Sequence, residues 1–352
     1  MSEKIEKIIE KLISTRTLST DEYENLIKER TPEVIERLRP VAEKVRCELY
    51  GRGVFVRGLI EISNICKNDC LYCGIRRSNL KIDRYRLTPE EILLCCKEGY
   101  SLGLRTFVLQ GGEDPYFTDA VLTDIVRRIK TEYPEAAVTL SLGERSFDSY
   151  KALRDVGVDR YLLRHETACP LHYKKLHPSA MNYDNRMRCL RDLKSLGFQT
   201  GAGFMVGSPY QTERELALDL KFIEEFKPQM CGVGPFIPHK DTEFKNHPSG
   251  SVELTCYLLS IIRIIHPTVL LPATTALSTL TDDGHVRGIL FGANVVMPNL
   301  SPKSVRAKYA LYDGKKHSGS ESAEALAQLQ DKLNSIGYFI DYKRGDAINE
   351  RK

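Results

Sequence analysis

The sequence predicts an α/β fold in which eight parallel strands alternate with helices and close into a (β/α)8 TIM barrel. Three observations lead to this prediction. Apolar runs of strand length alternate with helical patterns eight times over about 250 residues, the usual size of such a barrel. No Gly/Ser-rich linker interrupts the alternation. Polar and charged residues recur just after the strands, at the end of a barrel where reacting groups lie.

Each predicted strand is a short apolar run, and a segment with helical periodicity follows it. The first barrel helix has the clearest signals, because Thr88 is suited to cap it, Pro89 to occupy its first turn and Gly103 to follow its end. The predicted strands are 54–63, 105–112, 136–143, 159–167, 199–207, 229–237, 269–276 and 293–299. The predicted barrel helices are 88–104, 117–133, 146–157, 182–197, 212–226, 252–267 and 282–292.

Additional helical segments flank the barrel on both sides in the sequence. A charged N-terminal region carries a capping-box pattern near 19–24, and a last helix is expected at 322–337 before a polar tail. The predicted divisions are 1–50 for an N-terminal helical extension, 51–315 for the barrel, and 316–352 for a C-terminal helix and tail.

The charge and the distribution of apolar residues indicate which kinds of partner the protein is not expected to need, such as nucleic acids and membranes. The 352 residues include 51 basic and 47 acidic ones, and a net charge of +4 gives no case for a nucleic-acid partner. No run approaches the roughly eighteen apolar residues of a membrane span, and the first residues lack the apolar core of a signal peptide. We therefore expect a cytoplasmic protein. Its ten cysteines are then interpreted as metal ligands, reactive groups or small core residues rather than disulfides.

Three of these cysteines form a compact motif directly after the first predicted barrel strand. Cys66, Cys70 and Cys73 have the spacing C-x3-C-x2-C in the stretch "CKNDCLYC". A [4Fe–4S] cluster usually takes four thiolates, so three leave one iron with an open coordination site. An open site on a metal centre is typical of chemistry rather than scaffolding. The alternative is zinc, which would need a fourth ligand such as His165 or His239.

The motif resembles that of the radical S-adenosylmethionine (SAM) superfamily. Cys66, Cys70 and Cys73 match its three cluster ligands, and Tyr72 matches the aromatic residue that usually precedes the last cysteine. The resemblance implies a barrel of the radical SAM type with two cofactors, a [4Fe–4S] cluster and SAM. It also implies a 5′-deoxyadenosyl radical, which needs a water-poor cavity.

Other segments resemble the biotin-synthase-like branch of the superfamily, and within it the [FeFe]-hydrogenase maturation enzymes. The resemblance runs from about residue 54 to 312. The segments are "EISNICKNDCLYCGIRRSN", "RYRLTPEEI", "TFVLQGGEDPY", "VTLSLGE", "DRYLLRHETA", "GAGFMVGSPYQT", "GVGPFIPH", "PATTA" and "GANVVMPN".

The resemblance implies a set of SAM-binding residues at strand ends. Glu166 matches a residue at the ribose and amino end of SAM, and Arg186 one at its carboxylate, which a planar guanidinium pairs bidentately. From spacing alone, Arg186 would instead be a solvated charge on a helix face. The remaining expected cofactor-binding residues are Gly111, Gly112, Glu113, Gln110, Thr139, Ser141 and Met297. Gln110, Thr139 and Ser141 are expected to border the substrate as well.

The expected substrate site centres on Arg164. Arg164 lies two residues before Glu166, so both side chains should point into the barrel, where an unpaired charge is costly. In the family, the matching arginine binds the carboxylate of a cysteine-like substrate. The other residues expected at this catalytic site are Thr274, Thr275, Tyr309 and Tyr312, although two tyrosines at this spacing also suit simple packing.

The resemblance implies a role in building the organometallic H-cluster of [FeFe]-hydrogenase. The expected substrate is a small cysteine-derived, iron-bound molecule, and the product leads to the dithiolate bridge. Other hydrogenase maturases and an electron donor are expected partners. Three alternatives stay open: a methylornithine synthase-like mutase, a biotin synthase, and a non-catalytic carrier of an iron–sulfur precursor.

Overall fold

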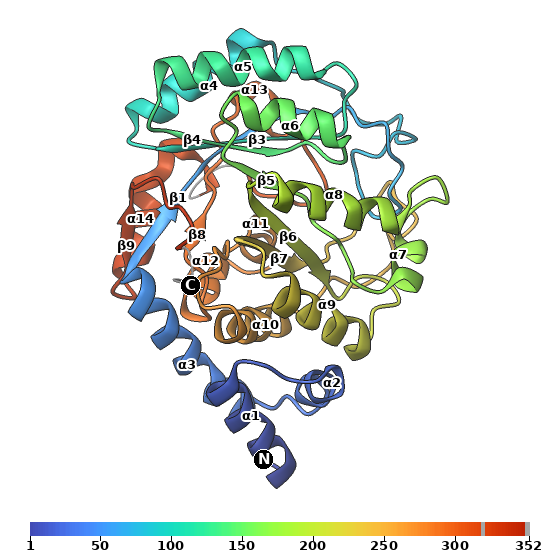
Figure 1. The fold of residues 1–352 in the computed structure, drawn as a ribbon, viewed down its shortest axis with the longest axis vertical. Coiled ribbons are helices and arrows are strands. Elements are labelled where there is room, and N and C mark those ends of the chain that lie inside the picture. Colours follow the sequence, from blue (N-terminus) through green and yellow to red (C-terminus); the bar gives the residue numbers. More distant parts are fainter. Residues whose placement is uncertain (318–320, 349–352) are drawn as a thin grey trace.

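Eight parallel strand segments close into a barrel in the computed structural model, which describes residues 1–317 and 321–348 (Figure 1). Six strands pair in chain order: β2 (Gly58–Ser63), β3 (Thr106–Gly111), β4 (Ala137–Ser141), β5 (Arg160–Leu162), β6 (Gln199–Val206) and β7 (Met230–Pro235). Single bridges then lead from Met230 to Leu270 and from Pro272 to Val295 of β8 (Val295–Val296). A bridge between Leu59 and Asn299 returns to β2 and closes the ring. The predicted (β/α)8 fold is confirmed.

Helices surround this barrel and begin where the sequence signals predict. Thr88 accepts a hydrogen bond from the Glu91 backbone, and the Glu91 carboxylate accepts one from the Thr88 backbone in return. The helices that follow the strands are α4 (Pro89–Ser101), α5 (Asp119–Glu132), α6 (Phe147–Asp155), α7 (Pro170–Leu176), α8 (Tyr183–Ser195), α9 (Glu213–Phe226), α10 (Val252–Ile265), α11 (Thr275–Leu280), α12 (Gly284–Leu290) and α13 (Lys303–Arg306). Among the described residues, no helix is long and apolar enough to cross a membrane.

Three N-terminal helices pack on the outside of the barrel beside α9 and α10 (Figure 1). They are α1 (Glu3–Thr15), α2 (Thr20–Lys28) and α3 (Pro32–Tyr50). The buried Tyr23 of α2 donates a hydrogen bond of 2.6 Å to Glu224 of α9. This contact joins the N-terminal helices to the barrel, together with the ion pairs that Arg214 of α9 makes with Asp21 and Glu24 of α2.

The N-terminal end of the barrel differs from the sequence prediction. The single strand expected at 54–63 is divided into β1 (Gly53–Val56) and β2, and β1 pairs with β8 and with β9 (Phe339–Asp341). The polar tail thus contributes a strand. The expected helix at 322–337 is a 3₁₀ turn (Ala323–Ala325) followed by α14 (Leu326–Asn334). Of the predicted C-terminal segment, 318–320 and 349–352 lie outside the described residues.

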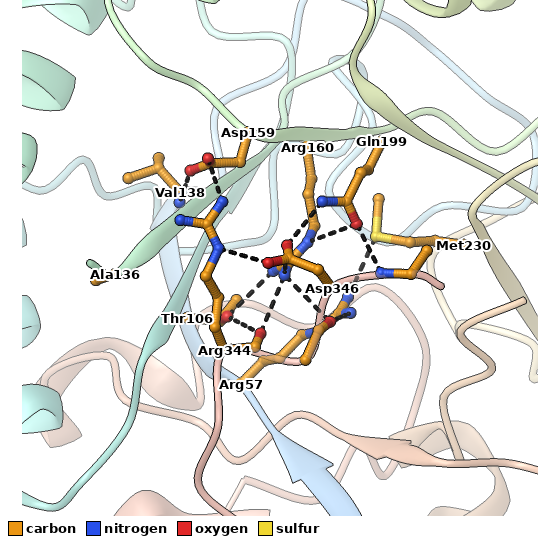
Figure 2. A network of polar contacts seen from close by, with 12 residues as sticks. Arg57, Thr106, Ala136, Val138, Asp159, Arg160, Gln199, Met230, Arg344 and Asp346 are labelled. Atoms are coloured by element: carbon orange, nitrogen blue, oxygen red, sulfur yellow. Dashed lines mark hydrogen bonds and ion pairs between the residues drawn. The ribbon is translucent and has the colours of Figure 1, made fainter. Parts of the chain in front are cut away.

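Beyond β9, the tail fills the barrel as a plug at the N-terminal end of its strands (Figure 2). We call this the lower end of the barrel, and the C-terminal end of the strands the upper end. The fully buried Arg160 donates to the backbone carbonyls of Arg344 and Gly345 at 3.0 and 3.1 Å and to the Asp346 carboxylate at 2.7 Å. Arg160 also donates to Thr106 at 3.1 Å. Above this polar network lies an apolar layer of Phe55, Met230, Leu270 and Val295, with Leu162, Met297 and Ala347 packed against it.

Candidate active site

A cavity of about 350 Å³ opens at the C-terminal end of the barrel strands. The predicted site residues that line it are Cys66, Cys70, Tyr72, Cys73, Gln110, Gly111, Gly112, Glu113, Ser141, Arg164, Glu166, Arg186, Thr274, Thr275, Met297, Tyr309 and Tyr312. Thr139 is the exception. It lies one layer deeper than Ser141 on β4, is 2% exposed, and its hydroxyl has no hydrogen-bond partner among the described residues.

The cysteine loop presents its three thiols to this cavity, and backbone N–H groups hold the first of them. The Cys66 sulfur accepts hydrogen bonds of 3.4 Å from the backbone N–H groups of Asn68 and Glu113. Burial, and then the neighbouring Cys66, raises the pKa of the Cys73 thiol to about 12. Buried thiols become thiolates when a cation shares their site, as in an iron–sulfur cluster. Three free thiols in one cavity therefore fit the expected cluster.

Two glycines let the strand ends approach this loop. A Cβ on Gly112 would lie 2.2 Å from the Ile65 carbonyl oxygen and 2.8 Å from Cys66 Cβ, so only glycine fits there. Gly143 has φ +77°, and a Cβ there would lie 2.1 Å from the Glu113 side chain. Glu113 can therefore fold under β4, where its carboxylate accepts from the Glu144 backbone at 3.1 Å. Gly143 was not among the predicted residues.

Glu166 is held in an unusual backbone conformation. Its φ of +67° lies in the left-handed region, which costs a non-glycine residue about 1–2 kcal/mol. Its Oε2 atom is buried without a hydrogen-bond partner among the described residues. Backbone strain combined with an unsatisfied carboxylate supports a functional role rather than a structural one.

The neighbour of Glu166 explains how this conformation is maintained. His165 points away from the cavity, and its Nε2–H donates to Asp219 of α9 at 3.1 Å. The Gly203 N–H donates to His165 Nδ1 at 3.2 Å, and the same Asp219 oxygen accepts from Ala168 N–H at 2.5 Å. Burial lowers the pKa of His165 to about 3, so the ring is neutral. Sequence reasoning considered His165 only as a zinc ligand, and its partners exclude that role.

Arg164 faces the cavity together with Glu166. Its Nη2 lies 3.2 Å from Glu166 Oε2, within ion-pair distance but without hydrogen-bond geometry. Its Nε and Nη2 atoms are buried and have no hydrogen-bond partner among the described residues. A buried guanidinium with free donors is suited to a planar anion such as a carboxylate.

Arg186 is buried rather than solvated, so the interpretation from spacing alone was wrong. Its side chain is 7% exposed on α8, and its Nε donates to Glu144 at 2.6 Å. Its Nη1 donates to the Arg164 carbonyl at 2.6 Å, which links the two arginines. Glu144, the last residue of the segment "VTLSLGE", had no predicted role, and it orients Arg186.

The opposite wall carries hydroxyl groups. Thr274 precedes α11, and its buried Oγ1 has no hydrogen-bond partner among the described residues. A Cβ on Gly234 would lie 2.8 Å from this oxygen, so the glycine leaves room for it. Tyr309 is 2% exposed, and its hydroxyl accepts from Gln110 Nε2 at 3.5 Å. These groups could complement the donors of Arg164 around a small polar substrate.

A buried ion pair in the same cavity was missed from the sequence. Glu61 of β2 is fully buried, and Lys315 lies 2.6 Å from its carboxylate. Asn299 donates to the second Glu61 oxygen at 2.9 Å. The signal was a single glutamate in the otherwise apolar strand "GLIEIS". Its partner could not be found locally, because Lys315 is 254 residues away.

Comparison with known proteins agrees with this geometry. The Radical SAM superfamily profile matches residues 60–223. The chain is 46% identical over 280 residues, 80% of each chain, to the [FeFe] hydrogenase maturase subunit HydE of Thermotoga maritima. It is 30% identical over 306 residues, 86% of each chain, to 3-methylornithine synthase of Methanosarcina barkeri.

Solved structures have the same fold. The crystal structure of methylornithine synthase (PylB) matches with a TM-score of 0.83 at 27% identity, covering 95% of this chain and 97% of that one. The FeFe-hydrogenase maturase HydG from Carboxydothermus hydrogenoformans matches with a TM-score of 0.82 at 24% identity, covering 97% and 80%. At that identity, the HydG match supports the fold alone.

Proposed function

Since the chain belongs to the radical SAM superfamily and, within it, to the family of the [FeFe] hydrogenase maturase subunit HydE, we propose that it acts in hydrogenase maturation. Its reaction is a radical SAM reaction on a small cysteine-derived, iron-bound substrate, and it contributes to the dithiolate bridge of the H-cluster. The observation that carries this proposal is the single cavity shared by the cysteine loop and the Arg164–Glu166 pair.

The residues present suit both cofactors. Cys66, Cys70 and Cys73 would hold the [4Fe–4S] cluster, and Glu166 and Arg186 would hold SAM. When bound, the cluster and SAM together supply a 5′-deoxyadenosyl radical. Gly111, Gly112 and Glu113 would contribute backbone and carboxylate contacts to SAM, and Gln110, Ser141 and Met297 would border it. Thr139 is not among the residues that line the cavity, and its role towards the ligands stays a prediction.

The substrate would be oriented by charge and by hydroxyl groups. Arg164 would bind its carboxylate, since its unpaired N–H donors lie inside the cavity. Thr274 and Thr275 would donate or accept at the far side, and Tyr309 and Tyr312 would cover the substrate and exclude water. Fixing the substrate in this way makes one position accessible to the radical.

A second candidate is a methylornithine synthase-like mutase. The TM-score of 0.83 to PylB and the 30% identity to 3-methylornithine synthase favour it, since the fold and an amino-acid substrate would be shared. The greater identity to the maturase HydE makes maturation the first choice. A non-catalytic carrier would have no use for a strained Glu166 beside an Arg164 whose Nε and Nη2 make no hydrogen bond among the described residues.

The setting of the protein follows from the same proposal. Other hydrogenase maturases would supply the substrate and consume the product, and an external electron donor would reduce the cluster. We place the protein in the cytoplasm, where its thiols stay reduced. The helices of residues 1–50 would be an extension of the barrel domain at 51–315, with 316–352 as its C-terminal addition.

The deciding experiment is activation of an apo-[FeFe]-hydrogenase in a defined maturation mixture, with and without this protein. We expect hydrogenase activity only with the protein. The Arg164→Ala variant should fail, and Arg191→Ala, an exposed arginine on α8, should behave as the wild type. Formation of 3-methylornithine, without hydrogenase activation, would favour the mutase instead. A dithionite-reduced sample that forms no 5′-deoxyadenosine would refute both enzymatic functions.

A further inference from the structure

On the surface beside the cysteine loop, several large apolar side chains are unusually exposed to solvent. Leu80, seven residues after Cys73, is 91% exposed, and Leu171 of α7 is 70% exposed. Tyr210, in the loop after β6, is 56% exposed. Exposed apolar side chains that gather on one surface, rimmed by polar groups, are typical of a protein-binding face.

These residues belong to one continuous surface. The Leu71 N–H donates to the Leu176 carbonyl at 3.0 Å, which joins the cysteine loop to α7 (Figure 1). Leu71 and Leu176 also pack with the buried Phe244, whose ring contacts Tyr210. We call the surface formed by residues 67–81, α7, 208–211 and 239–247 the cluster-loop face.

Ion pairs tie the remaining loop to the same face. Lys81 lies 2.8 Å from Asp241, and Arg76 lies 2.8 Å from Asp69 and 3.6 Å from Glu243. The acidic residues of these pairs are therefore already neutralised by neighbouring cations. The pairs also hold the segment that carries Leu80 against the segment 239–247.

The cluster-loop face carries an excess of positive charge. Five cationic residues on it have no ion pair among the described residues: Arg77, Lys174, Lys175, Lys240 and Lys245. All five are exposed. The whole chain has a net charge of only +4. Positive charge is therefore concentrated on this face, and the rest of the surface is close to neutral.

We propose that the cluster-loop face docks a small acidic one-electron carrier protein. The inference rests on the proposed function, because the radical SAM reaction consumes an electron from outside the chain. The carrier is oxidised by one electron and the cluster is reduced by it, with no bond formed or broken. The five cations would steer and orient the acidic partner, and Leu80 and Leu171 would supply the desolvated centre of a weak, transient interface.

The position of the face supports this partner over other acidic proteins. The docking residues come from three connected segments: the cysteine loop with its continuation to residue 81, α7, which the Leu71–Leu176 hydrogen bond joins to the loop, and 239–247, which Arg76 and Lys81 join to it by ion pairs. A carrier seated there would place its redox centre near the buried thiols without opening the barrel. Electron transfer requires such a short separation, whereas delivery of a substrate would require access to the cavity itself.

The test measures the Kd of the full-length protein for oxidised flavodoxin, with and without the cluster. Flavodoxin is a suitable probe because it is acidic and carries a coloured flavin. The charge-reversal variant is Lys174→Glu/Lys175→Glu. The matched control, Lys4→Glu/Lys97→Glu, makes the same charge change on α1 and α4, away from the face. We expect the Kd for flavodoxin to rise about tenfold or more in the first variant, with a shallower salt dependence, and to stay within about twofold in the control.

A second variant tests the apolar part independently of charge. Leu80→Ser/Leu171→Ser should raise the Kd for flavodoxin several-fold without changing its salt dependence, because no charge is lost. Reoxidation of reduced flavodoxin, followed by stopped-flow absorbance, should slow in both face variants. Formation of 5′-deoxyadenosine with dithionite, a small reductant that needs no docking, should equal that of the wild type.

The outcomes separate the docking inference from the proposed function. A wild-type protein that forms no 5′-deoxyadenosine with dithionite would refute the proposed function. Flavodoxin binding that the face variants leave unchanged, or that the control weakens equally, would overturn the docking face. Self-association through this face, seen by sedimentation and lost in Leu80→Ser/Leu171→Ser, would overturn it in favour of a dimer.

Discussion

The two ends of the barrel use the same residue type in opposite ways. Arg160 and Arg164 lie four residues apart along one strand line, and both point into the barrel. At the lower end, Arg160 donates to Thr106, to two tail carbonyls and to Asp346 (Figure 2). At the upper end, Arg164 has only an ion pair with Glu166 and keeps two nitrogens without a hydrogen-bond partner among the described residues.

This difference separates a structural arginine from a ligand-binding one. A buried guanidinium must be compensated, and at the lower end the C-terminal tail compensates it. At the upper end, Arg164 Nε and Nη2 have no hydrogen-bond partner among the described residues. The same is true of Glu166 Oε2 and Thr274 Oγ1. Arg164, Glu166 and Thr274 line one cavity, so a ligand bound there would complete their network.

The largest effect is expected at the lower end. Arg160→Ala would remove the donors that hold residues 344–346, and it would remove one hydrogen bond each from Thr106 and Gln199. We expect the free energy of unfolding to fall by roughly 2–4 kcal/mol, discounted because Asp346 is 41% exposed. Urea denaturation would measure this. The activity per folded molecule should not change, and an intact stability would show that the plug is not structural.

The upper arginine should behave in the opposite way. Arg164→Ala would remove the proposed partner of the substrate carboxylate, and substrate-stimulated turnover should fall about 100-fold or more. Cluster content, SAM binding and the free energy of unfolding should remain near wild type. Iron content, SAM titration and 5′-deoxyadenosine formation measure these separately. Loss of the cluster in this variant would mean that Arg164 supports the fold of the site.

The support beneath Glu166 should give an intermediate effect. Asp219→Ala removes the acceptor for His165 and for the Ala168 N–H, so the left-handed Glu166 backbone would relax. We expect the Kd for SAM to rise about 10- to 100-fold, as happens when residues behind a binding group are removed. Glu225→Ala, which removes an exposed carboxylate near the end of α9, is the matched control. An unchanged Kd for SAM would show that the strain at Glu166 is maintained by other contacts.

The comparison also explains what the sequence could and could not predict. The site residues at the upper end could be predicted, because the cysteine spacing and the polar strand ends are local patterns. Such patterns can be recognised in the sequence without knowledge of the fold. The plug could not be predicted, since Arg160 and Asp346 are separated by 186 residues, and "YKRGDA" has the composition of an ordinary tail. Only closure of the barrel brings them together.

The upper end had limits of its own. Arg186 looks solvated by helix spacing, because its partner Glu144 comes from a different strand end. The resemblance placed Thr139 in the site, and it shares a strand face with Ser141, but alternation along a strand fixes the face and not the depth in the barrel. Glu61 was overlooked because its partner Lys315 lies far along the chain.

The smallest effect concerns pH, and it should distinguish the two ends. His177, beneath Tyr72, donates from Nδ1 to the Tyr173 carbonyl at 2.9 Å and accepts from the Tyr72 hydroxyl at 3.2 Å. Burial, and then the charge of Arg186, lowers the pKa of His177 from 6.5 to about 3. Below pH 6.5 the unfolded chain therefore binds a proton that the folded chain refuses. Stability is full above pH 6.5 and is lost as the pH falls towards 3, by roughly 1–2 kcal/mol at pH 5.5.

The lower end should be insensitive over this range. Arginines stay charged, and the pKa of Asp346 is lowered, because hydrogen bonding by Gln199 and the charge of Arg160 outweigh its burial. Its contribution is lost only below about pH 3.8. Hydrogen exchange, corrected for intrinsic rates, should therefore increase in α7 between pH 7.5 and 5.5 but not in residues 344–348. Equal increases at both ends would contradict this, because they would mean that His177 does not control the local acid sensitivity.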